Sequence, residues 1–322
     1  MIEEISKTRD SKLLAPQEYS VEETTIQVKA REFLPLKEQK NHQEALVLFL
    51  GWSFNENASS YEELAFSLAD NFDRKVILVN TKTKDLIEDS LYHEAEAVHN
   101  FIHDLGIVDA ILAGYSQGGA KATNLAVISQ EKAVINPRAL ILFSPTGLNS
   151  QKPGTLAAAF SLDFVAQTIP RILTERTTTR SKGEGGRTSK LKQYLNVAED
   201  VAAEAVSKIV KDKTKSPRRL AHEVSEMSQK NPRLEEIRIP VVLVQGKYDH
   251  PSGPKGKLAI EQMGGQDKEG SVEKELKNIF PNSPYVKRVL AKRTGKHTLL
   301  FHRSRQISKV VSYLVGRQKT KV

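Results

Sequence analysis

The stretch Gly114-Tyr115-Ser116-Gln117-Gly118-Gly119 lies where an apolar segment, Ala110–Gly114, passes into an alanine-rich helical pattern over Gly118–Ser129. A serine at such a strand-to-helix junction must turn sharply, and small residues two positions before and after it let strand and helix approach closely. The turn would lift the Ser116 hydroxyl clear of the sheet, and the helix N-terminus beneath it favours negative charge. The stretch therefore predicts a nucleophilic serine, although a bare G-x-S-x-G also occurs at ordinary turns. A phosphate-binding loop is excluded because no Gly-Lys-Ser/Thr follows.

Around this stretch apolar segments alternate with helical patterns, which indicates an α/β fold with a mostly parallel central sheet flanked by helices. We expect further strands at Ala45–Leu50, Val76–Asn80, Ala139–Phe143, Val241–Gln245 and Val286–Ala291, with an outer strand within Glu22–Phe33. We expect helices at Ser59–Asp70, capped by Ser59 or Ser60, at Ser90–Leu105, ended by Gly106, and at His302–Val315. Residues 1–20 show no clear pattern, so a loosely ordered N-terminal segment is expected there.

The alternation breaks between Phe143 and Val241, where helical patterns occur without a convincing strand. Residues 176–190 are polar and contain three glycines, residues 191–213 have the spacing of an amphipathic helix, and residues 216–230 favour another helix. We therefore expect a core made of residues 21–149 and 236–322, with residues 150–235 forming a helical cap or lid insertion.

The composition limits the class of protein. Of 322 residues, 39% are hydrophobic and 27% charged, so the chain can bury a core and is not broadly disordered. There is no cysteine, which excludes disulfides, thiolate chemistry and a zinc site built on cysteine. The N-terminal residues lack the basic and apolar regions of a signal peptide, and no apolar run reaches the length of a membrane span. A cytoplasmic protein is expected.

The formal charge of +9 is unevenly distributed, since residues 286–322 contain eleven Lys and Arg and no Asp or Glu. A solvated basic surface that aids solubility is the plain interpretation. Binding of anionic lipid or nucleic acid is the alternative, although motifs that interleave aromatics with Arg and Gly to read RNA are absent.

A serine hydroxyl needs a neighbouring base to become a nucleophile. His297 is the candidate because it lies in a loop just before the closing helix, whereas its competitor His302 should be held rigidly by that helix. His99 and His103 are spaced to share one helix face, but no carboxylate motif accompanies them, so we expect a surface face and no metal.

The base needs an acid to orient it, and the oxyanion of the reaction needs two N–H donors. Asp249 follows the strand Val241–Gln245, at the sheet edge expected for Ser116, whereas no acid follows Ala139–Phe143. An ordinary polar turn at Asp249 is the alternative. The N–H groups of Gln117 and Trp52 are the expected oxyanion donors, although Trp52 could equally be only a wall of the pocket.

Four segments together resemble the α/β-hydrolase superfamily: FLGW at 49–52, GYSQGG at 114–119, VVLVQGKYD at 241–249 and GKHTLL at 295–300. The resemblance implies a nucleophilic Ser116, an orienting Asp249 and a base His297, in the chain order that this fold uses. It also implies an oxyanion hole from Trp52 and Gln117, a cap over the pocket, and neither metal nor organic cofactor. Leu50 stands where the family usually has a histidine before the oxyanion-loop glycine, and the stretch between Asp249 and His297 is longer than in compact members.

The resemblance favours hydrolysis of a carboxylic ester, small or lipid-like, through an acyl-enzyme on Ser116. Tyr115, Phe160 and Phe164 are candidate pocket residues, although the two phenylalanines could instead belong to the packing of the cap. The same triad could act on a thioester, an amide or a carbon–carbon bond, or transfer an acyl group to another alcohol. An anionic membrane surface is a possible partner of the cap, and a non-enzymatic lipid- or nucleic-acid-binding module is a minor alternative.

Overall fold

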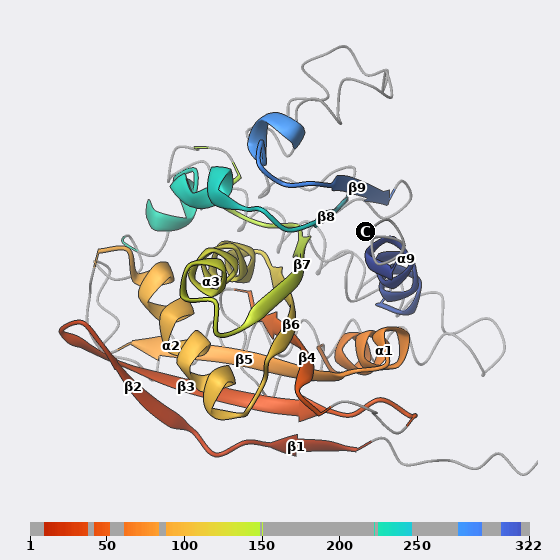
Figure 1. The fold of residues 1–322 in the computed structure, drawn as a ribbon, viewed down its shortest axis with the longest axis horizontal. Coiled ribbons are helices and arrows are strands. Elements are labelled where there is room, and N and C mark those ends of the chain that lie inside the picture. The colour runs from red at the N-terminus through yellow and green to blue at the C-terminus, as the bar shows by residue number, and fades with distance from the viewer. Residues whose placement is uncertain are drawn as a thin grey trace, which may run out of the picture.

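The computed structural model describes residues 10–37, 42–51, 61–83, 88–148, 150, 222, 225–246, 276–291 and 304–316. Within these ranges the strands form a nine-stranded sheet with the order β1-β3-β5-β4-β6-β7-β8-β9, and β2 also pairs with β3 (Figure 1). The strands are β1 (Ser11–Leu13), β2 (Gln17–Val21), β3 (Thr24–Phe33), β4 (Glu44–Phe49), β5 (Lys75–Thr83), β6 (Asp109–Tyr115), β7 (Asn136–Phe143), β8 (Val241–Gly246) and β9 (Val286–Ala291).

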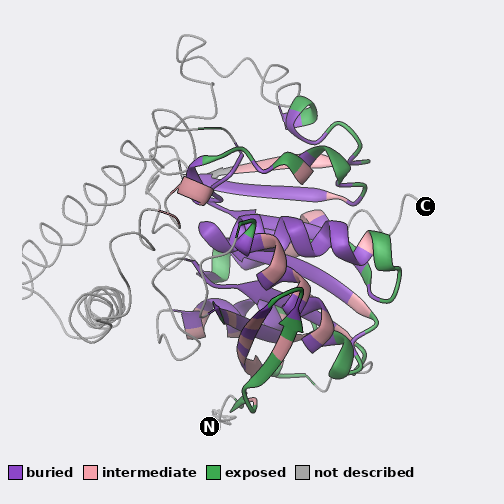
Figure 2. Ribbon diagram, turned by 90° about the vertical axis from the view of Figure 1, so that its left-hand side faces the viewer, coloured by how far each residue is buried: buried purple, intermediate pink, exposed green. Residues whose placement is uncertain are grey.

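The sheet is parallel from β5 through β9, whereas β3 pairs with β5 and with both N-terminal strands in antiparallel fashion. The apolar central strands are buried on both faces, as parallel strands covered by helices must be. Figure 2 shows the buried residues concentrated along these strands. The expected α/β architecture with a mostly parallel sheet is therefore confirmed.

Helices cover both faces of the sheet and divide the core into two clusters. The helices are α1 (Glu62–Phe72), α2 (Ser90–Asp104), α3 (Gln117–Lys132) and α9 (Ser304–Gly316), with a short 3-10 helix η3 (Pro232–Glu236). Val47 and Phe49 of β4 belong to the cluster under α2 and α3, whereas Leu46 and Leu48 belong to the cluster under α1 and α9. This alternation is what a strand requires, because successive side chains point to opposite faces.

Most predicted elements occur within a few residues of their expected bounds, but the N-terminus differs. Residues 11–13 and 17–21 form β1 and β2 on β3, so the expectation of a loosely ordered segment over 1–20 was wrong for these residues. The same pairing means that β3 is not an outer strand. Short strands with few apolar residues give a weak pattern, and here β3 supplies the pairing edge.

Two further expectations need comment. Helix α1 has Tyr61 at its N-cap with no side-chain capping bond, rather than Ser59 or Ser60, which lie outside the described residues. Of the predicted cap, only residues 150, 222 and 225–235 are described, and Leu234 in this part belongs to the buried core cluster beside α2 and α3. None of the helices in the described ranges combines the length and apolar character needed to cross a membrane.

Candidate active site

Ser116 joins the end of β6 to the start of α3 in a strained backbone conformation. Its φ is 55° and its ψ is −120°, a combination that residues other than glycine rarely adopt. Such strain persists only where the surroundings over-determine it, and it is concentrated at functional sites. The sharp turn predicted from the sequence is confirmed.

Main-chain hydrogen bonds hold Ser116 from both sides. Its N–H donates to the carbonyl of Phe143 at 3.0 Å. Its carbonyl accepts from the N–H of Gly119 at 2.9 Å and from the N–H of Thr146 at 3.1 Å. The loop after β7 is therefore part of the turn's support, in addition to β6 and α3.

The glycines around Ser116 allow the strand and the helix to meet. A Cβ atom on Gly114 would overlap the main-chain carbonyl of Gly118, and one on Gly118 would lie 2.5 Å from the carbonyl oxygens of Phe49 and Leu50. Neither position accepts a side chain without a shift of backbone. The close approach that the spacing predicted is confirmed.

The hydroxyl of Ser116 is buried, with only 2% of the residue exposed, and its Oγ has no hydrogen-bond partner among the described residues. The Oγ1 of Thr146 is also buried and has no hydrogen-bond partner among the described residues. Buried hydroxyl groups normally have partners, so these two, on residues joined by the Thr146 N–H to Ser116 carbonyl bond, need an explanation. Sequence analysis noted Thr146 only as part of a segment without an acid.

The segment that begins the expected oxyanion loop is anchored beside Ser116. Gly51 donates its N–H to the hydroxyl of Tyr61 at 3.1 Å, and a Cβ on Gly51 would lie 2.7 Å from the ring of Tyr115. The rings of Tyr61 and Tyr115 meet edge to face with centroids 6.2 Å apart. Burial raises the pKa of Tyr61, so its hydroxyl stays protonated. Sequence reasoning missed Tyr61, because a tyrosine before a helix carries no distinctive signal.

The structure places the ends of the parallel strands at one edge of the sheet. Gly114 pairs with Phe49, Tyr115 pairs with Phe143, and Phe143 pairs with Val244. Gln117, the first residue of α3, follows Ser116 directly and is buried. Five of the predicted site residues lie outside the described residues, namely Trp52, Phe160, Phe164, Asp249 and His297. In the sequence, Trp52, Asp249 and His297 come after β4, β8 and β9, and these three strands run parallel to β6, which ends directly before Ser116.

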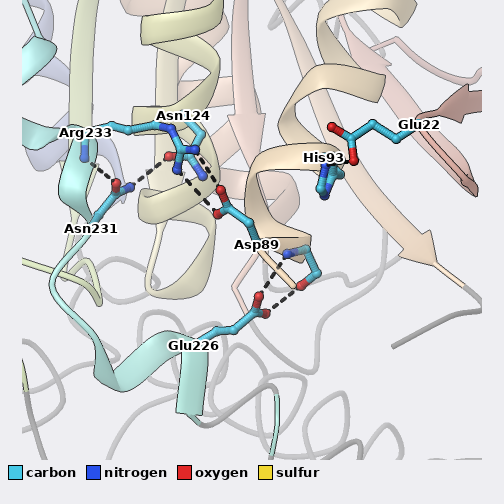
Figure 3. Close-up of polar contacts among 8 residues, drawn as sticks. Glu22, Asp89, His93, Asn124, Glu226, Asn231 and Arg233 are labelled. Carbon is cyan, nitrogen blue, oxygen red and sulfur yellow. Dashed lines mark hydrogen bonds and ion pairs between the residues drawn. The ribbon is translucent and has the colours of Figure 1, made fainter. Parts of the chain in front are cut away.

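A hollow of about 520 Å³ lies one helical turn beyond Ser116. Ala120 and Asn124 of α3 line it, together with Gly147, the start of α2 and residues within 222–233. Of these lining residues, Figure 3 shows Asp89, Asn124, Glu226, Asn231 and Arg233. Asn231 donates from its side-chain amide to Asn124 at 2.9 Å, and its main-chain N–H donates to the carbonyl of Gly147 at 2.7 Å. The wall of the hollow therefore combines polar side chains with apolar ones such as Leu91 and Met227.

Glu226 places a carboxylate on this wall. It accepts hydrogen bonds from the N–H of Ser90 at 2.8 Å and from the hydroxyl of Ser90 at 2.5 Å. Burial and, more weakly, the neighbouring Glu94 raise the pKa of Glu226, while the Ser90 bonds and His222 at 3.7 Å oppose that rise. The pKa of Glu226 is therefore raised overall.

Arg233 lines this hollow and also a second one of about 710 Å³, as do Glu88 and Asp89. Its guanidinium donates to both carboxylate oxygens of Asp89, at 2.7 and 3.4 Å, and lies 4.0 Å from the ring centroid of Tyr92. In the second hollow, Nε2 of His93 lies 3.2 Å from a carboxylate oxygen of Glu22 (Figure 3). No cluster of three or more metal-ligating side chains occurs within the described ranges.

A buried cluster of three polar residues joins α3 to α2 and β5. Lys121 forms an ion pair with Glu94 and donates to Thr81 at 2.9 Å, and Thr81 donates to Glu94 at 2.6 Å. All three are buried, and they join α3, α2 and β5. Sequence reasoning missed the pair, because two opposite charges on separate helices resemble ordinary surface residues.

The parallel sheet, its flanking helices and the strained serine after β6 define the α/β-hydrolase class. A family model described as serine aminopeptidase, S33, matches residues 81–277, more than half of the chain, and the chain belongs to this family. It is accordingly a hydrolase. The comparison with curated proteins found no match.

Solved structures with the same fold include several hydrolases. A probable hydrolytic enzyme from Pseudomonas aeruginosa PAO1 matches with a TM-score of 0.56 and 16% identity over 94% of this chain and 93% of its own. A thermophilic esterase from Thermogutta terrifontis has a TM-score of 0.57 and 14% identity, covering 94% and 99%. A membrane phospholipase A, described as a bacterial virulence factor, has a TM-score of 0.57 and 16% identity, covering 96% and 87%. At this level of identity the likeness concerns the fold.

Proposed function

We propose that this chain is a serine hydrolase that cleaves a carboxylic ester through an acyl-enzyme on Ser116. The observation that carries the proposal is the strained backbone of Ser116 at the end of β6, combined with a buried hydroxyl that no described residue bonds. A serine that served only as a helix-start turn would need neither the strain nor an unsatisfied hydroxyl.

The remaining roles follow from chain order and from the shared sheet edge. In this proposal His297 takes the proton of Ser116 as the hydroxyl attacks the ester carbonyl, and Asp249 orients the imidazole. The N–H groups of Gln117 and Trp52 stabilise the oxyanion, and loss of one such donor typically costs about 3–4 kcal/mol. The alcohol leaves with the proton from His297, and water then releases the acid through the same base.

Covalent labelling with a fluorophosphonate, read by intact mass, tests the proposal on wild type, Ser116→Ala and His297→Ala. We expect one adduct on wild type and none on either variant. Ser129→Ala is the matched control, because Ser129 is also a buried, unbonded hydroxyl on α3 but has an ordinary helical position. Labelling that persists in Ser116→Ala, or is lost in Ser129→Ala, would contradict the assignment. A series of p-nitrophenyl esters would then define the acyl length.

A second candidate is hydrolysis of an amide bond beside a free amino group. Two observations favour it: the family description names an aminopeptidase, and the hollow next to α3 is lined by the carboxylates of Glu88, Asp89 and Glu226. An aminoacyl p-nitroanilide with a free amino group should then be cleaved faster than its N-acetylated form, and Glu226→Gln should reduce that preference. If the acetylated and free substrates react equally, the amide candidate fails and the ester proposal is unaffected.

A further inference from the structure

The loop Ser144–Leu148 supports Ser116 and is itself strained. Its Thr146 N–H supplies one of the two hydrogen bonds to the Ser116 carbonyl. Ser144 has a φ of 44° and Gly147 a φ of 81°. The N–H of Ser144 donates to the carbonyl of Val244 at 2.8 Å, which fixes the start of the loop on β8. Further contacts must hold the second half of the loop, because a strained loop relaxes unless its surroundings hold it.

Asn231 holds the second half of the loop. Its main-chain N–H donates to the Gly147 carbonyl at 2.7 Å, and its side-chain amide donates to Asn124 at 2.9 Å. Its side-chain oxygen accepts from the N–H of Arg233 at 2.9 Å. Only 2% of Asn124 and 9% of Asn231 are exposed. One buried residue thus joins the loop beside Ser116 to α3, the helix that begins directly after Ser116.

The segment that carries Asn231 is fastened at both sides (Figure 3). Glu226 accepts two hydrogen bonds from Ser90, and Arg233 forms a two-bonded ion pair with Asp89 while stacking on Tyr92. These anchors lie at the N-terminus of α2, an element that does not contain Ser116. Asn231 is therefore held by contacts of its neighbours with a separate helix, which allows it to restrain the loop.

We propose that Asn231 is a positioning residue for Ser116, acting through its bond to Asn124 and through the Ser144–Leu148 loop. The inference rests on the proposed role of Ser116 as nucleophile. Without the hydrogen bond between Asn231 and Asn124, Gly147 and Thr146 are no longer held in place, and the Ser116 turn loses part of its support. A misplaced nucleophile slows the chemical step, and it leaves substrate binding unchanged.

The test measures the second-order rate of fluorophosphonate labelling, together with kcat and KM for a p-nitrophenyl ester. Asn231→Ala and Asn124→Leu should each slow labelling and lower kcat by about tenfold or more with KM unchanged. Asn124→Asp keeps an acceptor for the Asn231 amide and should stay within about threefold of wild type. Asn282→Ala is the matched control, because Asn282 is an exposed asparagine that bonds the main chain of Glu235.

The combination Asn124→Leu with Asn231→Ala should be no slower than the worse single variant, since both remove the same bond. Labelling of folded Asn231→Ala at the wild-type rate would overturn the proposal, as would additive effects in the double variant. A rise in KM at constant kcat would show substrate contact instead of positioning and would also overturn it. If Asn231→Ala does not fold, the contrast between Asn124→Leu and Asn124→Asp decides. Absence of labelling in wild type would instead refute the nucleophile assignment itself.

Discussion

A Cβ atom on Gly118 would lie 2.5 Å from the carbonyl oxygen of Phe49, so the nucleophile helix and β4 meet with no room for a side chain. Gly118→Ala must therefore move α3 or β4. We expect a loss of about 2 kcal/mol in the free energy of unfolding and a large fall in fluorophosphonate labelling. Urea unfolding and intact-mass labelling measure the two effects. Gly316→Ala at the end of α9, where a Cβ meets nothing within 4 Å, should change neither.

The hydroxyl of Tyr61 is expected to matter more than its ring packing alone. Tyr61→Phe keeps the edge-to-face contact with Tyr115 but leaves the buried N–H of Gly51 without its acceptor. We expect a loss of about 1–2 kcal/mol in the free energy of unfolding and a lower kcat, because the loop that leads to Trp52 begins at Gly51. Tyr313→Phe, at an exposed position of α9, is the control, and equal effects in the two variants would refute a specific role for Tyr61.

The sequence was informative wherever a local rule applied. The turn at Ser116 and the close approach of Gly114 to Gly118 follow from steric demands within six residues, so they could be predicted. The contact of Gly118 with Phe49 and Leu50 joins distant parts of the chain and could not. The alternation of apolar segments with helical patterns predicted the mostly parallel sheet, because this pattern can also be read from neighbouring residues. The N-terminal strands β1 and β2 were missed because their pairing depends on β3, which their own residues do not reveal.

The contacts that brace the site could not be predicted from the sequence, because they join residues far apart in the chain. Asn231 and Asn124 are 107 positions apart, and Glu226 and Ser90 are 136 apart. Neither pair has a spacing that indicates contact. Such bonds appear only when the fold has brought α2, α3 and the segment before β8 together.

Lys121 and Glu94 provide a test of how a buried ion pair between α3 and α2 behaves. Lys121→Met leaves the Glu94 carboxylate buried without its partner, and we expect a loss of about 3–5 kcal/mol in the free energy of unfolding. Adding Glu94→Leu should restore part of the loss, because no unpaired charge remains. Thermal and urea unfolding report both.

The matched control is Lys132 with Glu96, a more exposed pair on the same two helices, 2.7 Å apart. Lys132→Met should cost less than about 1 kcal/mol. If Lys121→Met lowers the free energy of unfolding no more than Lys132→Met does, burial of the Lys121–Glu94 pair does not affect stability.

Glu226 should make stability depend on pH in the direction opposite to an ordinary salt-bridged acid. Its pKa is raised above the usual 4.5 by burial first, so the native state holds its proton more tightly than the unfolded chain does. The resulting stabilisation is fully present below pH 4.5 and is lost as pH rises through the native pKa. Glu226→Gln cannot ionise and therefore does not lose this stabilisation. The difference in melting temperature, variant minus wild type, should increase from pH 4 to pH 8.

Ser90→Ala should make the decline of wild-type stability with pH steeper, because the Ser90 hydroxyl bond is one of the contacts that oppose the rise in the pKa of Glu226. A melting-temperature difference that stays constant with pH, or falls, would show that Glu226 ionises no less readily in the folded chain than in the unfolded one.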